Sequence, residues 1–184
     1  MSTYNIELRT GDVLLYQRAG AIGWLITKVT GGDRSHAGIV LVGWERNWVC
    51  DAAATGINLR PVSNDLDTGS RIAVYRVPET VPWEDLARRR LTAFAISKVG
   101  VYRYGLRKML RNAWTEVFGV PPGAKDPDDM PTKAMCSEWV SLLLRAFADF
   151  DPCPKWPDRF TTPDDLARKS DLVCVCENLT RVNK

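Results

Sequence analysis

Residues 33 to 42 of the chain are Asp33-Arg34-Ser35-His36-Ala37-Gly38-Ile39-Val40-Leu41-Val42. The polar start of this stretch predicts a turn, and the apolar run after it predicts a buried strand. His36 lies where the turn meets the strand, and it is the only histidine in the 184-residue sequence. One imidazole cannot form a multi-histidine metal site, so we expect it to act as a base that activates a nucleophile elsewhere in the chain.

Cys136 is the candidate nucleophile. It opens a segment with apolar residues at helical spacing, namely Trp139, Val140, Leu143, Leu144 and Phe147. A thiol reacts as the thiolate, and the unpaired amides and dipole at a helix N-terminus lower a thiol pKa. The backbone N–H of Cys136 would also be available to an oxyanion hole. Taken alone, the pattern also fits a small buried cysteine without a catalytic role.

Asp51 is the candidate for the residue that orients the imidazole. It lies in a strand predicted over residues 48–52, which Gly43 and the polar residues after it join to the His36 strand as a hairpin. A carboxylate there would fix the tautomer of His36 and stabilise the imidazolium. By itself, Asp51 also fits the end of a strand or the cap of a turn. Tyr102 and Tyr104 are expected to line the substrate pocket.

The remaining pattern predicts alternating strands and helices in one domain. Strands are expected over residues 11–16, 37–42, 57–62, 71–77 and 171–177, with 57–62 at a sheet edge because of its proline. Helices are expected over 21–29, from Pro82 through Ala95, over 103–117 and over 136–147. The helix after Pro82 is expected to have one apolar stripe, made of Trp83, Leu86, Ala87, Leu91, Phe94 and Ala95. Thr162 is expected to cap a further helix that has Pro163 in its first turn.

Composition excludes several classes of protein. The formal charge of +3, from 25 basic and 22 acidic residues, is too small to favour a nucleic-acid partner. Five cysteines, an odd number, favour reduced thiols over a disulfide framework. No apolar run approaches the length of a membrane span, and the N-terminus does not resemble a signal peptide. We therefore expect a cytoplasmic protein without stable membrane insertion.

No cofactor and no metal are expected. Cys174 and Cys176 would need Cys50 or Cys153 to complete a metal site. Residues two apart in a strand simply share a face, and the chain has neither a Cys-x-x-Cys pair nor further histidines.

Five motifs together resemble the circularly permuted branch of the NlpC/P60 papain-like superfamily, and within it the YiiX/YebB-like (YaeF/YiiX) type. Histidine precedes cysteine here, whereas in ordinary members the cysteine helix comes first. The resemblance covers roughly residues 10 to 170. The motifs are, in order, Gly11-Asp12-Val13-Leu14-Leu15, Ser35-His36-Ala37-Gly38-Ile39, Cys50-Asp51-Ala52, Cys136-Ser137-Glu138-Trp139-Val140 and Thr162-Pro163-Asp164-Asp165-Leu166.

The resemblance implies an α+β fold of the permuted papain-like kind over residues 1–184, with an antiparallel sheet or small barrel packed against helices. It assigns Cys136 as nucleophile, His36 as base and Asp51 as the third polar residue, a position where many relatives have another side chain. The implied activity is cysteine-dependent cleavage of an amide, as in a peptidoglycan-type or other small peptide, through a thioester.

A lipid-directed acyltransferase or thiol esterase of the lecithin:retinol acyltransferase-like type is the alternative, with a lipid as partner. Those relatives usually have a second histidine and an Asn-Cys-Glu motif, where this chain has Asp51 and Met135-Cys136-Ser137-Glu138. Arg103, Arg107 and Arg111 would share a helix face that meets a substrate phosphate or carboxylate, or simply faces solvent. A role in peptide recycling or a phage-encoded origin would reconcile a wall-peptide substrate with the lack of a signal peptide.

Overall fold

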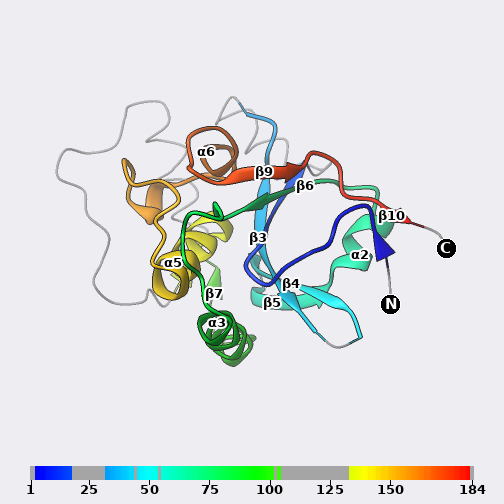
Figure 1. Ribbon diagram of the computed structural model, residues 1–184, viewed down its shortest axis with the longest axis horizontal. Helices are drawn as coiled ribbons and strands as arrows, with labels where there is room; N and C mark the ends of the chain where they lie inside the picture. The colour runs from blue at the N-terminus through cyan, green and yellow to red at the C-terminus, as the bar shows by residue number, and fades with distance from the viewer. Residues whose placement is uncertain are drawn as a thin grey trace.

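A six-stranded antiparallel sheet forms the centre of the protein (Figure 1). The computed structural model describes residues 3–17, 32–43, 45–53, 55–101, 103–104 and 133–182. The strand order is β5-β4-β3-β2-β6-β9. The strands span, in chain order, β2 Val13–Gln17, β3 His36–Val42, β4 Asn47–Ala53, β5 Gly56–Pro61, β6 Arg71–Arg76 and β9 Val173–Cys176. The sheet and its helices confirm the predicted α+β class with an antiparallel sheet.

In the described part of the chain, four helices accompany the sheet: α2 (Val62–Asp67), α3 (Asp85–Ser97), α5 (Cys136–Ala148) and α6 (Pro163–Arg168). A 3-10 turn, η1, covers Asp158–Phe160. Two short pairs complete the described part of the chain. β1 (Thr3–Tyr4) pairs antiparallel with β10 (Arg181–Val182), and β7 (Arg103–Tyr104) pairs parallel with β8 (Lys133–Ala134). None of the helices among the described residues has the length and apolar composition needed to cross a bilayer.

The sheet buries both of its faces, and alternate residues of each strand supply them. Odd-numbered residues of β2 and β3, such as Leu15 and Ile39, join the core cluster that contains α5 and α3. Even-numbered residues, such as Leu14, Tyr16 and Val40, join a second cluster, beneath α2 and the β1–β10 pair. Figure 1 shows α5 and α3 on one side of β3 and α2 on the other. We call these the α5 face and the α2 face.

The strand predictions are confirmed, and β5 lies at a sheet edge as its proline indicated. The helix after Pro82 begins later than predicted, at Asp85, because Glu84 before it is extended (φ −68°, ψ 152°). Its predicted apolar stripe is wrong at Leu86, which is 56% exposed, whereas Leu91 and Ala95 are buried.

The helix predicted from residue 103 is wrong at its start, because Arg103 and Tyr104 pair with Lys133 and Ala134 as strands. Backbone pairing with a distant segment therefore overrides the local helical pattern there. The predicted helix 21–29 and the rest of 103–117, with Arg107 and Arg111, lie outside the described residues. Helix α2, which the sequence pattern did not predict, fills the space after β5.

Candidate active site

Cys136 is the first residue of α5, as predicted, and local hydrogen bonds set this helix start. Met135 before it is extended (φ −85°, ψ 164°), and its backbone N–H donates to Oε2 of Glu138 at 3.0 Å. The hydroxyl of Ser137 donates to the carbonyl of Thr161 at 2.6 Å. Trp139 and Leu143 are fully buried on the same helix. The thiol is therefore held at the end of a well-packed helix, and Cys136 is 2% exposed.

His36 is the first residue of β3 and pairs with Tyr16 of β2. The Tyr16 ring lies 5.5 Å from the imidazole, centroid to centroid, at an angle of 55°. The imidazole hydrogen-bonds to the thiol of Cys136, and a backbone hydrogen bond from Ala37 also reaches that sulfur. The base and nucleophile predicted from sequence are thus in direct contact.

Asp51, on β4, completes the group. Its Oδ2 atom lies 2.5 Å from Nε2 of His36, and since a carboxylate only accepts, Nε2 carries the proton. The close approach of β3 and β4 depends on Gly38. A Cβ atom there would lie 2.5 Å from Cγ2 of Val49 and 3.3 Å from Cβ of Asp51. The structure therefore brings together all three residues of the predicted triad.

Mutual charge stabilisation shifts the pKa values of the thiol and the imidazole in opposite directions. Burial alone raises the pKa of the Cys136 thiol, but the neighbouring His36 imidazolium outweighs burial and lowers it. Burial alone lowers the pKa of His36, but the Cys136 thiolate and the hydrogen bond to Asp51 raise it to about 9. At neutral pH these shifts favour a thiolate paired with an imidazolium.

Sequence reasoning missed three residues behind Asp51. Nη1 of Arg60 lies 2.5 Å from Oδ2 of Asp51, the same oxygen that His36 contacts. The Arg60 fork also binds Asp65, with Nε 2.8 Å from Oδ1 and Nη2 3.1 Å from Oδ2. The Tyr16 hydroxyl donates to Oδ2 of Asp65 at 2.7 Å. We call these residues, from Cys136 through His36, Asp51, Arg60 and Asp65 to Tyr16, the charge chain.

The charge chain keeps Asp51 ionised. Burial alone would raise the pKa of Asp51, but His36 and Arg60 together lower it. Burial likewise disfavours the Arg60 cation, but Asp65 and Asp51 raise its pKa further above its usual value. One signal could have revealed Arg60: Asn58 lies opposite Asp51, and Arg60, two residues later, shares its sheet face. No comparable signal marks Asp65, because its helix was not predicted.

Most of the two tyrosines predicted to line the pocket falls outside the described residues. Tyr102 lies outside the described residues, and so does the side chain of Tyr104. The backbone of Tyr104 belongs to β7, which lies beside β5 and β4, the strands that carry Arg60 and Asp51. Their role as pocket residues stays a prediction.

The other cysteines are dispersed, and all five are free thiols. Burial raises the pKa values of Cys50 and Cys153 to about 12, so both are protonated at neutral pH. The thiol of Cys174 donates to Oε1 of Glu177, and that of Cys176 accepts from Asn5. In the described parts of the chain, no three His, Cys, Asp or Glu side chains form a group that could hold a metal ion.

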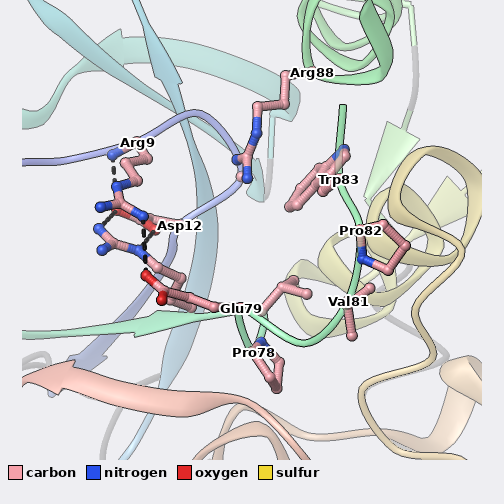
Figure 2. A pocket seen from close by; sticks show the side chains of 11 residues that line it. Arg9, Asp12, Pro78, Glu79, Val81, Pro82, Trp83 and Arg88 are labelled. Carbon is pink, nitrogen blue, oxygen red and sulfur yellow. Dashed lines mark hydrogen bonds and ion pairs between the residues drawn. The ribbon is translucent and has the colours of Figure 1, made fainter. Parts of the chain in front are cut away.

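A cavity of about 260 Å³ lies near the turn before β2 (Figure 2). Gly11 and Asp12 line it, and along an extended strand Asp12 is roughly 13 Å from Tyr16, the partner of His36. Arg76 binds Asp12 through two hydrogen bonds, and Arg88 lies over the Trp83 ring and donates to the carbonyl of Thr10. Arg76 thus fastens β6, and Arg88 fastens α3, to the segment before β2. The cavity lies at the opposite end of β2 from the pairing with His36, so it is separate from the charge chain.

Comparison with known proteins supports the fold. No family model matches the sequence, and no curated protein matches it. Among solved structures, the chain is similar to the crystal structure of the metalloprotein YiiX from Escherichia coli O157:H7, DUF1105, with a TM-score of 0.56 and 17% identity. The match covers 96% of this chain and 97% of that chain. At this identity, the likeness shows a shared fold.

Proposed function

We propose that this protein is a cysteine-dependent hydrolase of the permuted NlpC/P60, YiiX-like type, which cleaves an amide bond in a small peptide through Cys136, His36 and Asp51. One observation carries the proposal. The thiol at the start of α5 contacts an imidazole whose other nitrogen is held by a fully buried carboxylate. This is the arrangement that activates a thiol for acyl transfer.

The geometry supports a two-step reaction. The Cys136 thiolate attacks the amide carbonyl carbon, and the oxygen takes the negative charge near the start of α5, where helix amides have no intrahelical partner. The His36 imidazolium then donates its proton to the leaving amine, the C–N bond breaks and a thioester remains. In the second step neutral His36 takes a proton from water, the hydroxide displaces the thiolate, and the carboxylic acid is released.

Asp51 acts in this scheme on His36 rather than on the substrate. Its Oδ2 atom fixes Nε2–H, which leaves the other ring nitrogen directed to the reacting atoms. Removing the carboxylate should therefore lower the acylation rate more than substrate affinity.

A metal-dependent reaction is a weaker proposal, although the structural neighbour is a metalloprotein. The described residues provide no group of three ligating side chains. At the triad, Nε2 of His36 is already bonded to Asp51, and the imidazole also hydrogen-bonds to Cys136. These residues do not fit a metal site, and no step of the proposed reaction passes through a metal.

Mass spectrometry of the protein incubated with substrates tests the proposal. Muropeptides should yield cleaved amide products and a transient mass increase on Cys136, whereas short-chain phospholipids should be unchanged. The Cys136→Ala variant should show neither product nor adduct. Cys174→Ala, which removes a partly exposed thiol on β9, is the matched control and should retain full activity.

Transfer of a fatty acyl group from the phospholipid to Cys136 would instead establish the lipid-directed alternative. Amide cleavage that survives in Cys136→Ala would refute a cysteine mechanism altogether.

A further inference from the structure

We propose that Arg60 is a positioning residue that limits the proton affinity of His36, because it shares the Oδ2 atom of Asp51 with the imidazole. The inference rests on the proposed function, in which His36 must both hold a proton and give it up. Arg60 itself does not touch the reacting atoms. It acts through Asp51.

His36 and Arg60 both contact the same oxygen of Asp51, whereas two independent ion pairs would use one oxygen each. Both cations, the imidazolium and the guanidinium, lie 2.5 Å from the same oxygen, Oδ2 of Asp51. The other oxygen, Oδ1, is buried and has no hydrogen-bond partner within the described structure. Each cation therefore weakens the hold of that oxygen on the other. Arg60 partly neutralises the Asp51 carboxylate, which therefore attracts the His36 imidazolium less strongly.

Asp65 and Tyr16, on the side of Arg60 away from Asp51, fix the Arg60 guanidinium in this position. Asp65 binds its fork through two nitrogens, and Tyr16 in turn donates to Asp65. The Arg60 side chain is 23% exposed, and Asp65 is 5% exposed. A guanidinium bound in this bidentate way loses most of its rotational freedom, so its share of Oδ2 is constant.

Among the described residues, the charged and titratable groups around His36 come from five elements. They are Cys136 on α5, Asp51 on β4, Tyr16 on β2, Arg60 on β5 and Asp65 on α2. Cys50 lies next to Asp51 in sequence but faces α5, and its raised pKa keeps it neutral. Arg60 is thus the cation of this set that competes with the imidazolium for Asp51.

The competition between Arg60 and His36 for Asp51 matters for proton transfer in the proposed reaction. An imidazolium held by an undivided carboxylate would be slow to protonate the leaving amine, because its pKa would rise further. An imidazole without any carboxylate would hold its proton less firmly and would stabilise the thiolate less. Sharing Oδ2 gives an intermediate strength, as general acid–base catalysis requires.

The test exploits the single histidine of the chain. In full-length protein labelled with ¹³C-histidine, one ring resonance reports the titration of His36 by NMR without assignment. A Cys136→Ala background removes the thiolate from the measurement. Into it we would introduce Arg60→Met together with Asp65→Asn, which leaves the local net charge unchanged and no buried charge without a partner.

We expect the His36 pKa to rise by about one unit in this double variant, because Asp51 then acts on the imidazole alone. The matched control is Arg76→Met with Asp12→Asn, a second, partly buried pair with distances of 2.7 and 2.8 Å at the far end of β2. It should leave the His36 titration unchanged.

Opposite outcomes would overturn the proposal. A fall of the His36 pKa below its value in Cys136→Ala would mean that Arg60 merely holds Asp51 in place, and an unchanged value would mean that Arg60 does not act on His36. An equal rise in the Arg76 control would assign the effect to general loosening. None of these readouts needs a substrate, so they stand apart from any failure to find amide cleavage. If the double variant unfolds, Arg60→Lys in the same background provides the test. A lysine contacts Asp51 at a single point, so the His36 pKa should rise by less than about one unit.

Discussion

The α5 face and the α2 face belong to the same strands but have different chemistry. On the α5 face, a continuous apolar cluster surrounds Trp139, whose ring stacks on Phe94 at 6.2 Å. On the α2 face, apolar residues share the space with the buried ionic groups of Asp51, Arg60 and Asp65. His36 lies where the faces meet, since it follows the α2-face alternation on β3 yet contacts the thiol of α5.

The difference indicates a division of labour within one core. Apolar packing contributes stability without directionality and holds Cys136 in place through its helix. The ionic groups contribute little net stability, because desolvation offsets most of their attraction. They do contribute direction and a defined charge at His36. Four predictions separate the two contributions.

Trp139→Ala should have the largest effect on stability. The side chain is fully buried on the α5 face, and its loss should lower the free energy of unfolding by about 3–5 kcal/mol. Urea unfolding followed by circular dichroism measures the change. Leu86→Ala on exposed α3 surface is the control and should cost less than about 0.5 kcal/mol. Similar losses at the two sites would show that the α5 face is not the main apolar core.

Asp65→Asn should cost less, about 2 kcal/mol, because it removes one of two carboxylates from the partly buried Arg60. The same variant should lower the His36 pKa, since Arg60 then acts on Asp51 without a competitor. Under conditions in which Trp139→Ala is folded, that variant should not lower the His36 pKa. A stability loss without movement of the His36 titration would contradict the electrostatic role of the α2 face.

The pH dependence of the free energy of unfolding tests the pair of His36 and Cys136, which lies where the two faces meet. The pKa of His36 rises from 6.5 to about 9 on folding, so its contribution is complete below pH 6.5 and is lost as pH rises toward 9. The pKa of Cys136 falls on folding, so its contribution is lost as pH falls through the folded pKa and grows as pH rises toward the usual 9.0. Between these limits the two trends have opposite signs and offset each other.

The wild-type free energy of unfolding should therefore change little between pH 7 and 8. Cys136→Ala removes the rising contribution and also the thiolate that does most to raise the His36 pKa. Asp51 still raises that pKa, so the stability of the variant should fall over that interval by less than about 1 kcal/mol. Urea midpoints at several pH values give the comparison, with Cys174→Ala as the control that keeps the flat profile. A wild-type stability that falls between pH 7 and 8 as steeply as that of Cys136→Ala would argue against a thiolate–imidazolium pair.

Tyr16→Phe should have the smallest effect, about 1 kcal/mol, because it deletes a single hydroxyl donor to Asp65 and keeps the ring beside His36. Thermal unfolding measures the loss. The His36 titration should move less than in Asp65→Asn, since the Asp65 charge remains. A larger shift than that of Asp65→Asn would place Tyr16, rather than Arg60, in control of the imidazole.

The sequence by itself determined the elements that carry short-range signals. Apolar alternation gave β2, β3, β4 and β6. Helical spacing gave α5 from Cys136, and Thr162 caps α6 as predicted, accepting from the backbone N–H of Asp165. The hairpin that joins β3 to β4 was sufficient to place Asp51 near His36. These features depend on neighbours in sequence, so local patterns suffice to predict them.

Only the tertiary structure decided what supports Asp51. Arg60 reaches Asp51 from an edge strand, and Asp65 holds Arg60 from a short helix without a strong apolar period. Tyr16 closes the charge chain from β2, far earlier in the sequence. Likewise, Arg103 and Tyr104 became strand through pairing with β8. Hydrogen bonds and ion pairs between distant segments depend on register and burial, which no single stretch of sequence encodes.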